Sequence, residues 1–171
     1  MNTATDPMNV INAADRIRVL ATIDPDDPLL RAELDALAED TAQRTGMPTS
    51  MASLVLGMAQ HAAGSYGLTG ILALAGGTPI EWALCARTVT SGKPYIIPDA
   101  TRHPVESRNP LVTMGGLRAY AGYPATVAGH VVGAICVLTD TPHHFTDDQL
   151  TTLHQAADSM TDILQRHRDG K

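Results

Sequence analysis

The sequence has few aromatic residues and no excess of positive charge, and each shortage excludes a class of function. Six aromatic side chains occur in 171 residues, too few for a surface that stacks nucleic-acid bases. Twelve basic residues against eighteen acidic ones give a net charge of −6, which repels a polyanion. We therefore expect no nucleic-acid partner.

Long apolar runs and cysteines are also scarce. The longest uninterrupted apolar stretches, such as residues 71–75, fall far short of the ~20 residues that a membrane span needs. The N-terminal residues lack the basic and apolar regions of a secretory signal. Two cysteines, Cys85 and Cys136, are too few for a disulfide framework. Together these shortages predict a cytoplasmic protein with free thiols and no membrane contact.

The length predicts one domain whose first half begins with helices. Apolar residues at helical spacing predict a short helix over residues 10–20. Asp27 and Pro28 are typical of a helix start, and Gly46 is typical of its end. An almost continuous apolar run from residue 51, followed by small residues to 66, indicates a pair of strands.

The second half predicts a helix over residues 79–90, a strand over 95–97 and a hairpin over 118–138 that turns at Ala128 and Gly129. The segment 100–117 is longer than most connections, and loops of that length are usually functional or mobile. Thr146 and Gln149 form a capping box for a last helix that ends near His167. This order of elements predicts an α+β domain with helices packed on a mainly antiparallel sheet.

Several motifs, in order along the chain, resemble the GAF domain family of bacterial signalling proteins. They occupy residues 84–89, 92–100, 117–124, 129–137, 140–142 and 145–153. The resemblance implies a six-stranded antiparallel sheet, related to that of PAS domains, with the N- and C-terminal helices on one face and a pocket under a long loop on the other. It divides the chain into an N-terminal helical extension (1–26), the GAF domain (27–167) and a disordered tail (168–171).

Members of this family bind small molecules, chromophores, haem or metal, or serve as dimerisation modules, and the marks of particular subfamilies are missing here. The Asn-Lys pair of cyclic-nucleotide-binding members does not precede residues 145–148. Cys85 is followed by Ala86, whereas bilin-binding members place a histidine beside the cysteine. The free methionine-sulfoxide reductases of this fold resolve their catalytic cysteine with a partner in the pocket-side loop, and residues 100–117 contain no cysteine. The cofactor therefore stays unknown.

The resemblance and the predicted elements together nominate a set of ligand-binding residues. Cys85 lies on a helix beside the pocket, and Arg118 and Asp99 flank the long loop, where an ion pair between them would hold it. Core packing of Cys85 is the more common alternative. No histidines have metal-site spacing, so we expect no metal, and His103 alone is a candidate haem ligand. The nominated residues are Cys85, Tyr95, Asp99, Met114, Arg118 and Tyr120.

We therefore expect a non-catalytic, stand-alone sensory module that binds a small ligand and signals in trans to another protein. The apolar stripe of the last helix, including Met160 and Leu164, is typical of GAF homodimers that join through their terminal helices. Two alternatives remain: a ligand-free dimerisation module, and a redox sensor or methionine-sulfoxide reductase-like enzyme that uses Cys85.

Overall fold

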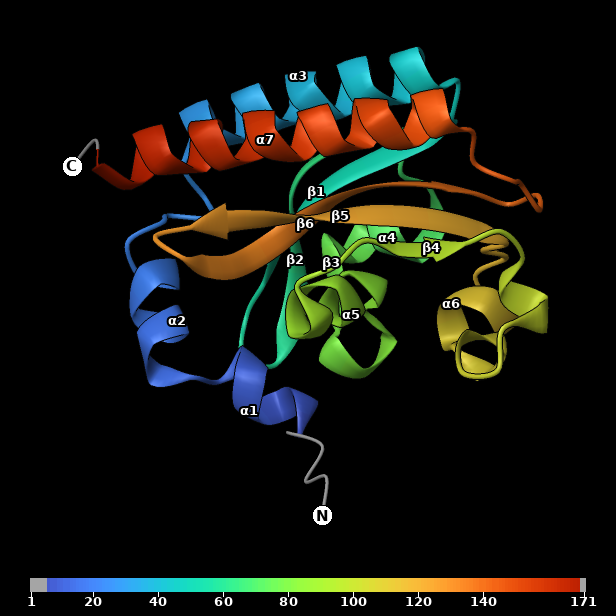
Figure 1. Cartoon of the computed structure of the whole chain (residues 1–171), viewed down its shortest axis with the longest axis horizontal. Coiled ribbons are helices and arrows are strands. Elements are labelled where there is room, and N and C mark those ends of the chain that lie inside the picture. Colours follow the sequence, from blue (N-terminus) through green and yellow to red (C-terminus); the bar gives the residue numbers. More distant parts are fainter. Residues whose placement is uncertain (1–5, 170–171) are drawn as a thin grey trace.

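A six-stranded antiparallel sheet separates two layers of helices (Figure 1). The structure is a computed structural model that describes residues 6–169. The strand order is β3-β2-β1-β6-β5-β4. The strands are β1 (Thr49–Val55), β2 (Ala59–Tyr66), β3 (Gly77–Pro79), β4 (Tyr95–Ile97), β5 (Ala119–Val127) and β6 (His130–Thr139). The helices are α1 (Pro7–Ile11), α2 (Ala14–Leu20), α3 (Pro28–Thr45), α4 (Gly70–Ala75), α5 (Leu84–Ser91), α6 (Pro110–Thr113) and α7 (Asp147–Asp169). The predicted fold class is confirmed.

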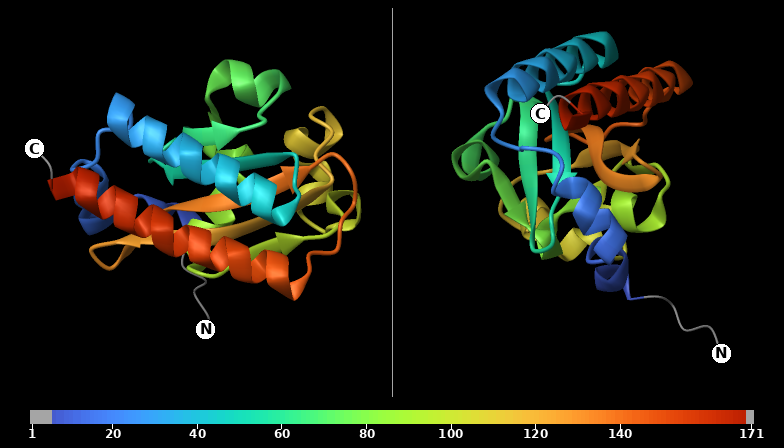
Figure 2. Two further views of the ribbon diagram at one scale, coloured as in Figure 1. Left: turned by 90° about the horizontal axis from the view of Figure 1, so that it is seen from above. Right: turned by 90° about the vertical axis from the view of Figure 1, so that its left-hand side faces the viewer.

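Two long helices, α3 and α7, lie side by side across one face of the sheet (Figure 2). The Asp27 carboxylate accepts the Leu29 N–H at 2.9 Å and starts α3, and Gly46 ends it with a φ of 70°. Gln149 and Thr146 exchange two hydrogen bonds, of 2.9 and 3.2 Å, at the start of α7, as the capping box predicts. These local signals therefore place both helix starts correctly.

The N-terminal extension holds two short helices where the periodicity predicts one. Asp6 accepts the Met8 N–H at 3.0 Å and Pro7 follows it, so α1 begins earlier than expected and α2 forms a separate helix. At the other end, α7 extends to Asp169, so residues 168 and 169 are helical and do not belong to the disordered tail that was expected over 168–171. Arg168 belongs to the helix and donates to the Thr22 hydroxyl at 2.9 Å, whereas residues 170–171 lie outside the described part of the chain.

Turns and close approaches set the hairpins. Ala128 and Gly129 have φ values of 49° and 79°, which form the predicted turn between β5 and β6. Gly64 of β2 lies directly under α3, because a Cβ built at Gly64 would stand 2.4 Å from the Leu34 Cβ. A side chain at this position would lift α3 off the sheet.

The second face of the sheet carries shorter elements than the sequence predicts. Residues 77–79 pair with β2 as β3, so α5 begins only at Leu84. Residues 100–117, expected as a long loop, contain two 3-10 turns, Ala100–Arg102 and Glu106–Arg108, and then α6. One apolar core fills each face of the sheet, and the core of this second face surrounds the candidate site.

Candidate functional site

A cavity of about 570 Å³ lies between the sheet and the segments that cover its second face. Its walls come from β1, β2 and β6, from residues 67–72, from the start of α5, and from residues 110–117. Most of the lining is apolar and includes Met51, Leu72, Trp82, Leu84, Leu111 and Leu138. Ligand pockets typically have volumes of about 300–1,000 Å³ with predominantly apolar walls, so this cavity has the size and character of a small-molecule site.

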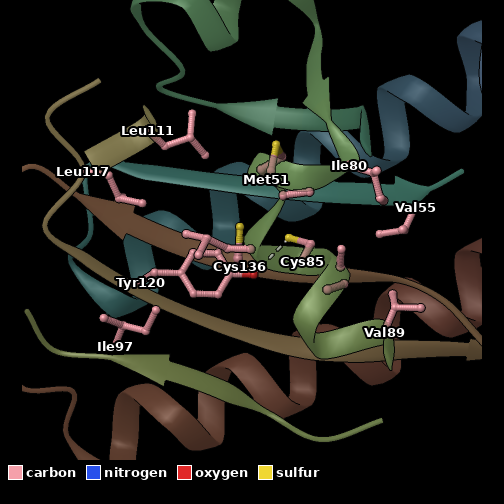
Figure 3. Close-up of a cluster of buried hydrophobic side chains, with 14 of the residues drawn as sticks. Met51, Val55, Ile80, Cys85, Val89, Ile97, Leu111, Leu117, Tyr120 and Cys136 are labelled. Atoms are coloured by element: carbon pink, nitrogen blue, oxygen red, sulfur yellow. Dashed lines mark hydrogen bonds between the residues drawn. The ribbon is translucent and has the colours of Figure 1, made fainter. Parts of the chain in front are cut away.

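Two cysteines and a tyrosine meet at the wall formed by α5 and the sheet (Figure 3). The Cys85 Sγ lies 3.0 Å from the Tyr120 hydroxyl, and both residues line the cavity. A hydrogen bond from Cys136 lowers the pKa of the Cys85 thiol, and the same contact raises the pKa of Cys136. Burial, with the neighbouring thiols, raises the pKa of Tyr120. Cys85 is therefore the thiol of this pair whose pKa is lowered by the contact.

The polar side chains of the lining include three threonines, Tyr120, Gln60 and Asp140. Within the part of the chain that the structure describes, Asp140 is the one charged residue of the lining, and it is exposed. Gln60 also lines the cavity and is 3% exposed, and among the described residues its Oε1 atom has no hydrogen-bond partner. The cavity therefore combines a buried, unpaired amide with an acidic group exposed to solvent.

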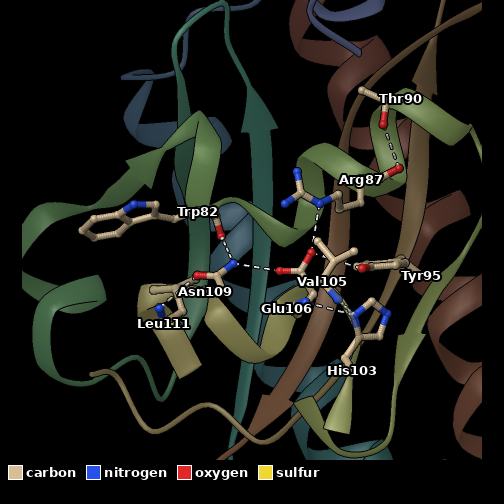
Figure 4. A network of polar contacts seen from close by, with 9 residues as sticks. All are labelled: Trp82, Arg87, Thr90, Tyr95, His103, Val105, Glu106, Asn109 and Leu111. Atoms are coloured by element: carbon tan, nitrogen blue, oxygen red, sulfur yellow. Dashed lines mark hydrogen bonds and ion pairs between the residues drawn. The ribbon is translucent and has the colours of Figure 1, made fainter. Parts of the chain in front are cut away.

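A buried carboxylate holds the segment that covers the cavity (Figure 4). The fully buried Glu106 accepts hydrogen bonds from Arg87 Nε at 2.9 Å, the Tyr95 hydroxyl at 3.1 Å and Asn109 Nδ2 at 2.8 Å. Asn109 also donates to the Trp82 carbonyl at 3.0 Å and caps α6 through the Leu111 N–H. The network therefore joins α5, β4 and α6 at one point.

Three of the six nominated residues line the cavity, namely Cys85, Met114 and Tyr120. Met114 is 76% exposed and lies at the edge of the cavity. Tyr95 lies outside the lining, where its hydroxyl binds Glu106. Burial, followed by the Glu106 charge and hydrogen bond, raises the pKa of Tyr95 to about 12.

Asp99 and Arg118 also lie outside the lining, and the ion pair expected between them is replaced by other partners. Asp99 caps the turn at residues 100–102 through Thr101 and pairs with Arg102 at 3.7 Å. The Thr101 hydroxyl is the main cause of the lowered pKa of Asp99. Arg118 donates to the carbonyls of Val112 and Leu117 at 3.1 and 2.9 Å. Arg118 does hold the covering segment, but through backbone carbonyls.

The candidate haem ligand, His103, has a local structural role. Its Nδ1 accepts the backbone N–H groups of Val105 and Glu106 at 3.1 and 3.0 Å, so the proton of the neutral ring is on Nε2. Its ring packs edge-on against Tyr95, with centroids 5.9 Å apart. Between residues 6 and 169, no group of three or more His, Cys, Asp or Glu side chains has the geometry to hold a metal ion.

Two residues that matter most to this site, Gln60 and Glu106, were not predicted. Gln60 lies two residues before the buried Ala62 at the start of β2, and a polar residue in phase with a core position of a strand is the signal that would have found it. Glu106 lies in a segment rich in polar and proline residues, where a buried carboxylate has no distinguishing mark. Its partners Arg87 and Tyr95 precede it by 19 and 11 residues.

Comparisons with known proteins identify the class to which this fold and cavity belong. Residues 29–162 match the GAF domain family, and the chain therefore belongs to that family. A search of curated proteins gave no match. No helix within residues 6–169 is long and apolar enough to span a membrane.

Solved structures with the same fold include free methionine-R-sulfoxide reductases and a GAF domain of a phosphotransferase. A free methionine-R-sulfoxide reductase from Neisseria meningitidis, in complex with its substrate, has a TM-score of 0.68 with 15% identity, over 99% of this chain and 96% of that one. The GAF domain of an Acinetobacter phosphoenolpyruvate-protein phosphotransferase has a TM-score of 0.67 with 15% identity, over 91% and 95%. A type II free methionine-R-sulfoxide reductase from Thermoplasma acidophilum has a TM-score of 0.67 with 14% identity, over 81% and 94%. Identities this low support the shared fold alone.

Proposed function

We propose that this GAF domain is a sensory module that binds a small molecule in the cavity and passes its occupancy to another protein. The observation that carries the proposal is the cavity itself, a volume of about 570 Å³ with a mainly apolar lining. A core packed to ordinary density has few voids larger than a water molecule. A space of this size is therefore a feature that the fold maintains.

Helix α5 offers a physical link from the cavity to the surface. Cys85 of α5 lines the cavity, and Arg87 of the same helix binds Glu106 under the covering segment. Helix α1 packs against α5. A ligand that shifts α5 would therefore displace α1, provided that it binds the two arrangements with different affinity.

The proposal includes self-association through the terminal helices and residence in the cytoplasm, where both free cysteines would stay reduced. Met160 and Leu164, the stripe expected to join two protomers, are 0% exposed within one chain. A dimer would therefore use the outer faces of α3 and α7. Sedimentation velocity distinguishes a monomer from a dimer directly.

The test is a thermal-shift screen of a metabolite library against the parent protein and two matched variants. Leu138 lines the cavity and is partly buried, so Leu138→Trp fills part of the space. Met58 is 84% exposed and lies outside the lining, so Met58→Trp is the control. A ligand at 100-fold excess over its Kd stabilises the parent by about 2.7 kcal/mol.

We expect a stabilising ligand whose effect persists in Met58→Trp and disappears in Leu138→Trp. A ligand that stabilises all three proteins equally would bind elsewhere and contradict the proposal. No stabilisation by any compound would favour the ligand-free dimerisation module.

The thiol pair supports a second candidate, reduction of a small sulfoxide. The Cys85 thiolate, favoured by the hydrogen bond from Cys136, would attack the sulfoxide sulfur, and the oxygen would leave as water after taking up two protons. Cys136 would then displace the thioether and form a Cys85–Cys136 disulfide, so the substrate gains the two electrons that the dithiol loses. An added dithiol would regenerate both thiols.

Methionine release from free methionine-R-sulfoxide in the presence of dithiothreitol tests this candidate. Cys85→Ser should abolish turnover, with the exposed-site variant Met58→Trp as control. Absence of turnover by the parent protein would exclude the reductase and leave the sensor.

A further inference from the structure

The side-chain amide of Gln60 lacks a strong hydrogen-bond partner among the described residues. Gln60 lies on β2, lines the cavity and is 3% exposed. Within residues 6–169, its Nε2 reaches only the Met51 thioether sulfur, at 3.9 Å, and its Oε1 has no partner. A thioether is a weak acceptor. Both ends of this amide are thus unsatisfied or nearly so.

A second unpaired group lies beside it. Thr78 of β3 is directly opposite Gln60 in the antiparallel register, and residues paired in this way project from the same face of the sheet. Thr78 is 6% exposed, and its Oγ1 also has no partner in the part of the chain that the structure describes. Gln60, which lines the cavity, therefore has a second buried polar group without a partner opposite it on the neighbouring strand, just behind the lining.

Such groups reduce the stability of the ligand-free protein. Buried polar side chains nearly always have hydrogen-bond partners, and an exception calls for a reason. Leucine has nearly the volume of glutamine and would leave no unmade hydrogen bond, so folding alone does not require glutamine here. A ligand that supplies the missing hydrogen-bond partners would explain why glutamine occupies position 60.

The charges around the cavity restrict what that ligand can be. No Lys, Arg or His is part of the lining among residues 6–169, and its one charged residue is Asp140. The net charge of the whole chain is −6. A buried anion is costly without a paired positive charge, and no lining residue among those described supplies one, so phosphates and carboxylates are disfavoured.

We propose that the ligand is an uncharged molecule with an apolar body and a carboxamide-like head that hydrogen-bonds the amide of Gln60. The inference rests on the proposed sensor function and specifies its ligand class. A half-turn about the last torsion of Gln60 exchanges its carbonyl and its NH₂, so the residue can complement a head group that both donates and accepts. Trp82 and the leucines of the lining contact the apolar body.

A matched series of naphthyl compounds tests the class. The four probes are 1-naphthylacetamide, 1-naphthylacetate, 2-(1-naphthyl)ethylamine and 1-ethylnaphthalene, which share a ring and differ in the head group. Isothermal titration calorimetry should rank the amide about tenfold tighter than the carboxylate. In Gln60→Leu, affinity for the amide should fall about fivefold, while that for 1-ethylnaphthalene is unchanged.

The thermal midpoint without ligand separates recognition from structural damage. We expect Gln60→Leu to melt at or above the temperature of the parent, because it removes an unpaired buried amide. Tighter binding of the carboxylate or the amine than of the amide would overturn the inference, as would equal losses for the amide and for 1-ethylnaphthalene in Gln60→Leu. Failure of all four probes to bind up to their solubility limits would also overturn it.

These outcomes are distinct from failure of the sensor function itself. An anionic library compound that loses its effect in Leu138→Trp would uphold the sensor and overturn the ligand class. Only the absence of any cavity-dependent compound in that screen would remove both.

Discussion

Arg16 lies on a short N-terminal helix, and its guanidinium is buried with no carboxylate in reach among the described residues. It donates instead to four carbonyls, those of Ile11 and Val55 at 2.8 and 2.5 Å and those of Val131 and Val132 at 2.8 and 3.3 Å. The last ladder pair of β1 with β6 is Leu54 with Gly133, so Arg16 satisfies carbonyls just beyond the point where the two strands separate.

We predict that Arg16→Ala lowers the free energy of unfolding by about 2–4 kcal/mol, because the carbonyls lose a shared donor. Arg16→Lys should recover only part of that loss, since an ammonium lacks the planar fork. Burial lowers the pKa of Arg16 to about 10, which still leaves it charged at neutral pH. Urea unfolding followed by circular dichroism measures the change.

The control is Arg18→Ala on the same helix, where the Arg18 side chain is 74% exposed and pairs with Asp15. A surface pair of this kind contributes at most about 1 kcal/mol. Similar losses of unfolding free energy for Arg16→Ala and Arg18→Ala would contradict this prediction. They would show that water replaces the guanidinium as the hydrogen-bond donor to the buried carbonyls.

Among the α-helices described here, α6 is the shortest, and its cap residue makes several contacts outside the helix. It has four residues, too few for a stable helix without tertiary support. Asn109 provides that support at three points: the Leu111 N–H, the Glu106 carboxylate and the Trp82 carbonyl. Asn109 is therefore, with Glu106 and Arg118, one of the side chains that hold the covering segment of the cavity.

Asn109→Ala should lower the free energy of unfolding by about 1–2 kcal/mol, through the lost cap and the Glu106 hydrogen bond. Amide hydrogen exchange should accelerate in residues 105–117 more than in α3 or α7. Thr113→Ala, at an exposed position of the same helix, serves as the control. Uniform acceleration across the chain would mean that Asn109 supports the whole fold rather than this segment.

Elements whose signals are local were predictable, and those defined by distant partners were not. The cap at Asp27, the turn at Ala128 and the capping box at Thr146 use neighbours within three residues, and each forms as expected. Strand β3 has three residues and exists through its pairing with β2, which no local pattern indicates.

The residues of the candidate site also differ in how far their positions could be predicted from the sequence. Cys85 and Tyr120 follow from the family resemblance and do line the cavity. The partners of Arg118 are backbone carbonyls set by the path of residues 112–117, and side-chain identity carries no information about such partners. The prediction of an ion pair between Asp99 and Arg118 was wrong for this reason.

At the scale of the whole molecule, the first and last parts of the domain meet at one end of the α3–α7 pair. The His167 ring lies 3.2 Å from Asp27 Oδ2 and 3.2 Å from Glu33 Oε2, and Arg166 binds Glu33 at 3.2 Å. Because Met160 and Leu164 are consumed by the core of one chain, a charged substitution there would report on folding rather than on assembly. The partly exposed carboxylates of Asp27 and Glu33, at this end of the helix pair, can be neutralised without disturbing that core.

The Leu29 N–H, with His167, lowers the pKa of Asp27 from its ordinary value of 3.8, and Arg166, with His167, lowers that of Glu33 from 4.5. A carboxyl whose pKa is lower in the folded state stabilises the fold above its ordinary pKa, and that contribution is lost as the pH falls through the lowered value. We therefore predict that the contribution of these two carboxyls is constant from pH 7 to about 5 and declines below about pH 4.5.

Urea unfolding at a series of pH values measures this contribution in the parent and in the double variant Asp27→Asn with Glu33→Gln. Asparagine keeps the helix cap, so the variant removes the titration while the start of α3 stays in place. Its stability should fall less steeply between about pH 5 and 3 than that of the parent. Glu39→Gln, at an exposed position of α3 away from His167, should keep the parental slope. Parallel slopes for the parent and the double variant would show that both carboxyls titrate alike in the folded and unfolded chain, so that α3 and α7 are held together by their apolar faces alone.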